Sequence, residues 1–230
     1  MVAAQKQKIA NFLDITGDFL GSGYRSEPAD YQFEADAPEI QDGVDSLERI
    51  AMEIKACRAC PLCEKRLNPA PGEGVLKPKV MVIGEGPGED EDKQGRPFVG
   101  KAGQLLDKML DSIGLSRNTN CFIANAVKCR PPGNRDPFPD ETRSCAHFLD
   151  RQITLLKPDY ILVLGRIAAH TLLNTSDSLG KLRGKCLELT CGNVKFPVIV
   201  TYHPAALLRT EDYKRPTWED LKLLRSKITI

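Results

Sequence analysis

The sequence lacks the features that mark a membrane protein, a secreted protein or a phosphate-loop enzyme. Its longest apolar runs, such as YILVLG, are far shorter than the roughly 20 residues that span a bilayer. Residues 1–19 have neither the apolar core nor the cleavage site of a secretory signal. The Walker pattern G-x-x-x-x-G-K-[ST] is also missing. We therefore expect a cytoplasmic protein with no membrane partner.

The whole chain has almost no net charge, but its two parts carry charge excesses of opposite sign. The net charge is +1, yet residues 1–50 hold four Lys or Arg against ten Asp or Glu, and the other 180 residues hold 28 against 21. A basic body behind an acidic arm is compatible with a nucleic-acid partner, although such an excess is also common on a solvated face. Contents of 41% hydrophobic and 27% charged residues are typical of a globular domain.

Residues 1–44 are predicted to be an acidic N-terminal extension and linker, and residues 45–230 a single domain. Residues 6–20 place apolar side chains mostly at helical spacing, and residues 21–43 are rich in Gly, Ser, Pro, Asp and Glu. The stretch KQKIANFL, residues 6–13, faintly resembles a sliding-clamp peptide. An amphipathic helix that packs on the body explains it better.

From residue 79 onward, strand and helix patterns alternate. The runs VMVI and ILVL are continuously apolar, which suits strands covered on both faces. Such alternation predicts an α/β fold with a parallel sheet between two helical layers. Strands are expected over residues 79–85, 120–127, 159–165 and 196–203, and helices over 100–114, 140–156 and 166–174. Because ligands bind at the carboxyl ends of parallel strands, the segments that follow these strands are the candidate site.

The segment after the first of these strands, GEGPGEDEDKQGRPFVG, covers residues 84–100. Its glycines at 84, 86 and 88 do not form the dinucleotide pattern G-x-G-x-x-G. The acids at 89–92 would repel a pyrophosphate, so nucleotide binding is disfavoured. The glycines instead suit a backbone that approaches a flat ligand closely. Phe98 is either a stacking platform for that ligand or a core residue.

Eight cysteines in a cytoplasmic chain point to metal ligation rather than disulfides. Cys57 and Cys60 form a C-x₂-C chelate, and Cys129 and Cys145 could complete four thiolates. The spacing alone leaves an iron–sulfur cluster and a Cys₄ zinc site equally open. Cys63 extends the first pair into a ferredoxin-like run and is a further candidate. The remaining cysteines are interpreted as buried or incidental thiols: Cys121, Cys186 and Cys191.

Three separated motifs carry a family resemblance. GEGPGEDEDKQGRPFVGKAGQLLDKML, NAVKCRPPGNRDPFPDE and YHPAALLR occur in the order in which the family 4 uracil-DNA glycosylases carry them. The chain resembles these iron–sulfur members of the uracil-DNA glycosylase superfamily over roughly residues 54–228. The resemblance implies a three-layer α/β/α sandwich around a four-stranded parallel sheet. It also implies base-excision repair, in which uracil is removed from DNA to leave an abasic site.

The resemblance assigns roles to residues that the strand pattern leaves open. It implies a [4Fe–4S] cluster on Cys57, Cys60, Cys129 and Cys145, in preference to zinc, and does not use Cys63. Phe98 matches the family's stacking aromatic, and Asn125 matches the amide that bonds the uracil edge. His203 matches the donor to the uracil oxygen. Glu85 and Gly86 are placed along the uracil pocket.

The family departs from better-known glycosylases at Gly86, where those enzymes carry an aspartate that orients the water. Glu91, which the family pattern places near the reacting sugar, is our best candidate for that role. After His203, either Leu207 or Leu208 could wedge into the gap left by the flipped base, unless both belong to a helix packed on the core. Phosphate contacts are expected from Arg209 and, more weakly, from Lys101, Arg130 and Arg183.

Two other functions remain open from the residues alone. One is a superfamily relative that binds uracil-containing DNA without turnover or acts on another deaminated base. The other is a zinc-dependent nucleotide-binding module. We expect a monomer that acts on single- or double-stranded DNA. A weak sliding-clamp contact through residues 6–13 is the less favoured alternative to a helix packed on the body.

Overall fold

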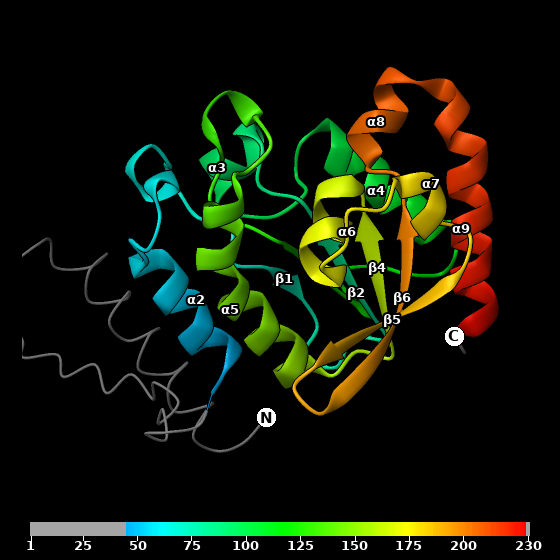
Figure 1. The fold of residues 1–230 in the computed structure, drawn as a ribbon, viewed down its shortest axis with the longest axis horizontal. Coiled ribbons are helices and arrows are strands. Elements are labelled where there is room, and N and C mark those ends of the chain that lie inside the picture. Colours follow the sequence, from blue (N-terminus) through cyan, green and yellow to red (C-terminus); the bar gives the residue numbers. More distant parts are fainter. Residues whose placement is uncertain (1–44, 229–230) are drawn as a thin grey trace, which may run out of the picture. The chain divides into compact units, whose positions relative to one another are not determined.

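The computed structural model describes residues 45–228 (Figure 1). The predicted helix over residues 6–20, with its clamp-like peptide, lies outside this part of the chain. Within residues 45–228 no helix is long and apolar enough to cross a membrane. The predicted boundary at residue 44 remains a prediction.

One mixed sheet forms the centre of the described part. Its strand order is β1-β3-β2-β4-β6-β5. The four inner strands are parallel, and the two edge strands are antiparallel to their neighbours. The α/β prediction with four parallel strands is therefore confirmed, whereas both edge strands were missed. The strands are β1 (Glu73–Gly74), β2 (Val80–Gly84), β3 (Cys121–Asn125), β4 (Tyr160–Leu164), β5 (Cys186–Cys191) and β6 (Val194–Thr201).

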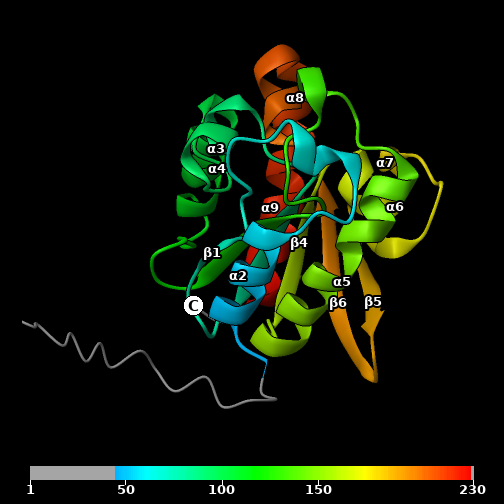
Figure 2. The same ribbon diagram turned by 90° about the vertical axis from the view of Figure 1, so that its left-hand side faces the viewer.

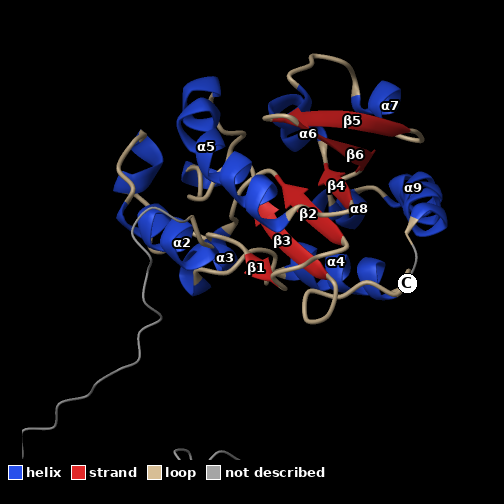
Figure 3. Ribbon diagram, turned by 90° about the horizontal axis from the view of Figure 1, so that it is seen from below, coloured by secondary structure: helices blue, strands red, loops and turns tan. Residues whose placement is uncertain are grey.

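Helices cover both faces of this sheet, as Figure 3 shows from below. Val80 and Val82 of β2 face a core cluster shared with α4 (Lys101–Asp111) and α9 (Lys214–Lys227). Met81 and Ile83 face the opposite cluster, shared with α5 (Pro139–Leu156), α6 (Arg166–Leu173) and α7 (Leu179–Leu182). Because side chains alternate along a strand, a run of four apolar residues supplies both cores.

A third, smaller core joins α2 (Leu47–Ala56) to α5, which lie side by side in Figures 1 and 2. Ile50 and Ile54 of α2 pack with Phe148 of α5 and with the cysteines Cys129 and Cys145. The 3₁₀ turn η1 (Pro61–Glu64) adds Leu62 to this core. Helix α2 thus brings the first cysteine pair, which follows its last turn, against the second.

Short helices gather where the parallel strands end. α3 (Glu89–Gln94) follows β2, the 3₁₀ turn η2 (Pro132–Asn134) follows β3, and α8 (Pro204–Arg209) with η3 (Glu211–Tyr213) follows β6. Since the four inner strands are parallel, these segments meet at one end of the sheet. This end carries the candidate site.

Candidate active site

A pocket of about 360 Å³ opens at the carboxyl ends of β2, β3 and β6. It brings together residues that lie more than a hundred positions apart in the sequence. Seven of the residues that the sequence singled out line it: Glu85, Gly86, Glu91, Phe98, Asn125, His203 and Arg209.

Asn125 presents an unsatisfied amide to this pocket. The residue ends β3 and is 1% exposed, yet neither its side-chain Oδ1 nor its Nδ2 has a hydrogen-bond partner. They are the two orphaned buried side-chain polar atoms of the described residues. A buried amide without partners costs about 1–3 kcal/mol. An unpaired amide at the wall of a pocket indicates that a ligand supplies the missing donor and acceptor.

Phe98 lies buried beside this amide in a strained conformation. Its φ of 53° places the backbone in the left-handed region, which is uncommon for an aromatic residue. A Cβ on Gly84 would stand 2.4 Å from Phe98 Cζ and 2.5 Å from Asn125 Oδ1, so the bare glycine lets both side chains approach β2. Arg117 donates to the carbonyl oxygens of Pro97 at 3.0 Å and Phe98 at 2.8 Å.

His203 also lines the pocket, as the N-cap of α8. Its ring centroid is 5.5 Å from that of Phe98. The backbone N–H of Ala205 donates to His203 Nδ1 at 3.2 Å, so in the neutral ring the proton is on Nε2. Burial, followed by the nearby charge of Arg209, lowers the pKa of His203 to about 4. At neutral pH this residue is therefore a neutral imidazole that can donate a hydrogen bond from Nε2.

Glu85 is the pocket carboxylate with the most perturbed acidity. Burial, reinforced by the carboxylate of Asp136, raises the pKa of Glu85 to about 7, and Arg166 opposes the shift. At the next position, a Cβ on Gly86 would lie 2.8 Å from Val127 Cγ2. Packing against the segment that follows β3 therefore favours glycine at position 86.

Glu91 holds the turn that shapes the pocket. Its Oε1 accepts from the backbone N–H groups of Val99 at 2.8 Å and Gly100 at 2.9 Å, and its Oε2 accepts from Gly88 at 3.1 Å. These bonds tie the start of α3 to the backbone that follows Phe98. Glu91 lines the pocket, but much of its hydrogen-bonding capacity is already used.

The apolar residues of α8 correct one expectation. Leu207, predicted as a DNA wedge, is 5% exposed and belongs to the core under α4 and α9. Its neighbour Leu208 is 55% exposed. Of these two leucines, the short helix therefore directs Leu208 outward and buries Leu207.

The basic residues that were predicted to contact phosphate also differ in exposure and in their partners. Arg209 and Lys101 are exposed, and Arg209 lines the pocket. Arg183 donates from Nε to the buried carboxylate of Asp220 at 3.0 Å and from Nη2 to the carbonyl of Pro216. Its charge is engaged inside the fold, so Arg183 is a structural residue rather than a phosphate contact.

The sequence reasoning missed the loop between β3 and α5 as a wall of the pocket. Pro131, Asn134, Arg135 and Asp136 all line it. The motif PPGNRDPFPDE contributed to the family resemblance, but its residues were not assigned to the site. Arg117 was missed because it lies outside all three motifs.

Five cysteines line a second, apolar pocket between α2 and α5: Cys57, Cys60, Cys63, Cys129 and Cys145. Arg66 donates from Nη1 to Cys129 Sγ at 2.9 Å. The backbone N–H of Lys128 donates to Cys145 Sγ at 3.4 Å. Within residues 45–228, no group of three or more His, Cys, Asp or Glu side chains is placed to hold a metal ion.

These surroundings fit a thiolate-bound cluster in their chemistry. Thiolates are the ligands of iron–sulfur clusters, and hydrogen bonds to the sulfurs stabilise their negative charge. Burial raises the pKa of Cys145 to about 11, so its thiol stays protonated at neutral pH without a bound cation. The other three cysteines lie outside this pocket: Cys121, Cys186 and Cys191.

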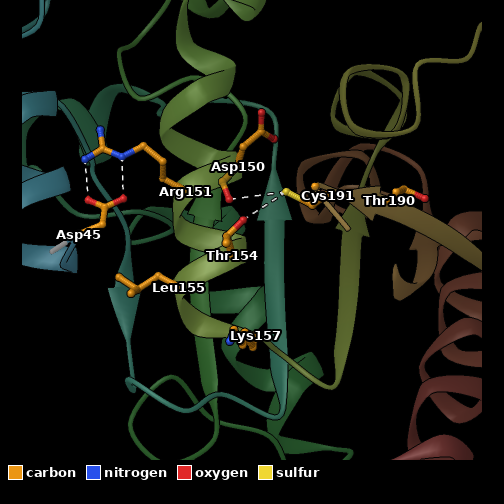
Figure 4. A pocket seen from close by; sticks show the side chains of 9 residues that line it. Asp45, Asp150, Arg151, Thr154, Leu155, Lys157, Thr190 and Cys191 are labelled. Atoms are coloured by element: carbon orange, nitrogen blue, oxygen red, sulfur yellow. Dashed lines mark hydrogen bonds and ion pairs between the residues drawn. The ribbon is translucent and has the colours of Figure 1, made fainter. Parts of the chain in front are cut away.

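A further hollow lies between the last turns of α5 and the β5–β6 hairpin (Figure 4). Arg151 binds the carboxylates of Asp45 and Glu53 there, which fastens α2 to α5. Cys191 Sγ approaches Thr154 Oγ1 at 3.5 Å. Because α5 runs antiparallel to the strands, this hollow lies far from the carboxyl ends that carry the first pocket.

Comparisons with known proteins agree with these observations. The sequence profile of the Uracil DNA glycosylase superfamily matches residues 71–222, which contain the whole first pocket. A type-4 uracil-DNA glycosylase of Sulfurisphaera tokodaii is 44% identical over 187 residues, which cover 79% of this chain and 84% of the relative. The corresponding protein of Archaeoglobus fulgidus is 42% identical over 183 residues, covering 78% and 92%. That of Thermotoga maritima is 42% identical over 185 residues, covering 79% and 94%.

Proposed function

Because the chain belongs to the uracil DNA glycosylase superfamily, we propose that its first pocket receives a uracil flipped out of DNA. The protein is an enzyme of DNA repair that hydrolyses the N-glycosidic bond of uracil and leaves an abasic site. Base flipping costs a few kcal/mol, which contacts inside the pocket must offset.

The unpaired amide of Asn125 is the observation that carries this proposal. Uracil presents a ring N–H between two carbonyl oxygens, and an amide can accept from the first and donate to one of the others. Both amide atoms of Asn125 are without a partner in the described structure. Binding uracil would therefore remove a standing desolvation cost while reading the edge that distinguishes uracil from cytosine.

Phe98 would stack on the flipped ring, because its side chain lies directly beside Asn125 over Gly84. The strain at its backbone is maintained by the surrounding contacts, which is typical of residues that a binding site must orient. A ring held in this way loses little conformational entropy when the base arrives.

His203 would supply the main electrostatic contribution to bond cleavage. The departing uracil becomes an anion as the sugar becomes oxocarbenium-like. The Nε2–H of a neutral His203 can donate to the uracil oxygen where this charge develops. Removing such a donor typically lowers kcat by about 10²–10³-fold.

The attacking water needs an orienting group, since Gly86 has no side chain. Glu91 is our proposal for this role, consistent with its place on the pocket wall. Glu85 lines the same pocket, and its partial protonation near neutral pH would limit repulsion of the uracil anion. The exposed Leu208 and Arg209, with Lys101, would contact the DNA beside the pocket.

Cys57, Cys60, Cys129 and Cys145 would hold a [4Fe–4S] cluster, with Arg66 and the Lys128 N–H donating to two of the sulfurs. When bound, the cluster would cross-link α2, the segment after β3 and α5. Lys128 also donates from Nζ to the carbonyl oxygen of Asn125 at 3.0 Å. This residue thus joins the cysteine pocket to the backbone of the uracil pocket.

Residues 45–230 would form the complete glycosylase domain, with residues 1–44 as an extension. Deleting residues 1–43 should leave uracil release unchanged. A truncated protein that folds but no longer releases uracil would contradict this assignment.

A strand-cleavage assay tests the activity. A labelled oligonucleotide with one uracil, single- or double-stranded, is incubated with the protein and then treated with alkali. Cleavage at the uracil alone, lost in Asn125→Ala and His203→Ala, is the expected result. A folded protein that binds the oligonucleotide but leaves it uncut would point to binding without turnover or to another deaminated base.

A further inference from the structure

Phe138 is a large apolar side chain with no place in the core. It precedes α5 and is 54% exposed. The loop that carries it runs from β3 past the uracil pocket, so that Figure 1 shows it at the same end of the sheet as α8. Burial in a core therefore does not account for an aromatic residue at this position.

Phe138 is held in place at its ring and at its backbone. The guanidinium carbon of Arg135 lies 3.8 Å from the ring centroid, which is a cation–π contact. Glu141, which is 1% exposed, accepts from Arg135 at 2.8 and 2.6 Å and from the backbone N–H of Phe138 at 2.7 Å. The buried carboxylate of Glu141 thus fixes both the backbone of Phe138 and the guanidinium of Arg135 that lies against its ring.

This platform is continuous with the uracil pocket. Arg135, which covers one face of the ring, also lines the pocket together with Asp136 and Asn134. A molecule that occupies the pocket and extends beyond it on this side therefore passes the exposed part of Phe138. For uracil in DNA, the molecule that extends beyond the pocket is the rest of the same strand.

We propose that Phe138, backed by Arg135, is a stacking platform for a base adjacent to the flipped uracil on the same strand. The inference rests on the proposed function. When uracil leaves the helix, its neighbours lose a stacking partner. An aromatic ring accepts any base on its free face, and such contacts are worth about 1–3 kcal/mol per base. Because Arg135 is already paired with Glu141, its charge serves the ring rather than a phosphate.

The platform predicts a specific effect on substrate binding. Phe138→Ala should raise KM for a short single-stranded uracil oligonucleotide about tenfold and leave kcat nearly unchanged. Phe138→Tyr, which keeps the ring, should behave like the wild type. Leu155→Ala is the matched control, since Leu155 is an exposed apolar residue near the other end of α5. Thermal unfolding should be the same in all variants, because the backbone N–H to Glu141 is retained.

Oligonucleotides that lack one base test the contact directly. An abasic residue replaces the base on the 5′ or the 3′ side of the uracil. On one of these sides, the missing base should weaken binding by the wild type as much as Phe138→Ala weakens binding of the intact oligonucleotide. Combining the missing base with Phe138→Ala should then weaken binding little further. The proposal would be overturned if Phe138→Ala had no effect on binding. It would also be overturned if the loss of a base and Phe138→Ala weakened binding independently, so that their effects multiplied, whichever side of the uracil lacked its base.

Affinity is measured in parallel by fluorescence anisotropy on oligonucleotides with 2′-fluorodeoxyuridine. The fluorine destabilises the oxocarbenium-like state, so this nucleotide resists cleavage and binding is read without turnover. If no uracil is released from any oligonucleotide, the proposed activity fails, and the anisotropy series alone decides whether Phe138 stacks on a neighbouring base.

Discussion

Arg117 donates a hydrogen bond from Nη2 to the carbonyl oxygen of Phe98 at 2.8 Å and binds the carboxylate of Asp107 with the same guanidinium. Because Asp107 lies in α4, Arg117 joins this helix to the turn in which Phe98 has a positive φ. A Cβ on Gly103 would stand 2.0 Å from the same carbonyl oxygen, so the helix packs directly on this turn. Arg117 and Gly103 together hold Phe98 in a conformation that it would not adopt alone.

Replacing Arg117 should therefore impair catalysis from a distance. Arg117→Ala should lower kcat/KM at least about tenfold, because small displacements of a positioning group carry large costs. Arg117→Lys should restore little, since an ammonium cannot reproduce the forked contacts. Arg117 forms an ion pair with Glu73 at 3.5 Å as well. Arg96→Ala is the control, because Arg96 binds the same carboxylate but makes no hydrogen bond to Phe98. Steady-state kinetics with unchanged activity in Arg117→Ala would contradict this role.

Asn125 should separate activity from stability. Asn125→Ala removes two unsatisfied polar atoms, so the free energy of unfolding should stay the same or increase despite the small cavity. Uracil release should fall by at least about 10²-fold, because the edge of the base is no longer read. Urea unfolding and a single-turnover assay on the same preparation measure both effects. A variant that loses stability and keeps activity would show that the amide is structural.

Glu85 should make stability decrease as the pH rises toward 8. Its pKa, raised by burial to about 7, exceeds the ordinary value of 4.5, so the folded protein holds a proton that the unfolded chain releases. This contribution is full below about pH 4.5 and is lost as the pH rises through 7. His203, whose pKa is lowered to about 4, has the opposite effect below its ordinary value of 6.5.

Comparing urea unfolding of the wild type and Glu85→Gln between about pH 6.5 and pH 8 isolates the Glu85 contribution, because any remaining titration of His203 is common to both proteins. Glu85→Gln should flatten the dependence on pH in this interval, since the amide does not titrate. The Asp136–Arg166 pair beside it stays unchanged in this variant. Parallel pH curves for the variant and the wild type would rule out the raised pKa of Glu85.

Replacing Arg183 should lower stability, whereas replacing Arg209 should weaken DNA binding. Arg183→Ala leaves the carboxylate of Asp220, which is 0% exposed, with only Thr201 and Gly184 as donors. Breaking such a pair should lower the free energy of unfolding by about 3 kcal/mol. Arg209→Ala should leave stability unchanged and reduce the salt dependence of DNA binding by about one phosphate contact. A lower salt slope in Arg183→Ala, with normal stability, would reverse the assignment.

Cys145 should be required for both colour and stability. Cys145→Ala removes a predicted cluster ligand from the core between α2 and α5, so iron content, visible absorption and unfolding temperature should fall together. Cys63→Ala is the matched control, because Cys63 lines the same pocket but is not one of the four predicted ligands. A Cys145→Ala protein that keeps iron and stability, or a Cys63→Ala protein that loses them, would require a different ligand set.

The sequence by itself was sufficient to predict the α/β fold and seven of the residues that line the pocket. The continuous apolar runs of β2 and β4 indicated strands covered on both faces, so that their carboxyl ends marked the candidate site. These signals are local, because a strand's burial and its carboxyl end are both evident from consecutive residues. The family resemblance then singled out Glu85, Asn125 and His203 at the carboxyl ends of the predicted strands. The edge strands were missed because β1 has two residues and β5 is only half-buried.

Only the tertiary structure decided which residues face the site and which face the core. The rotation of the six-residue α8 buries Leu207 and exposes Leu208, and no periodic pattern is long enough there to separate them. Arg183 is occupied by Asp220, which lies 37 positions away. The contacts of Arg117 with Phe98 and of Glu141 with Phe138 likewise depend on where separate segments meet. Residue types and spacing determined the chemistry available to this protein, whereas packing between distant segments determined which groups remain free to use it.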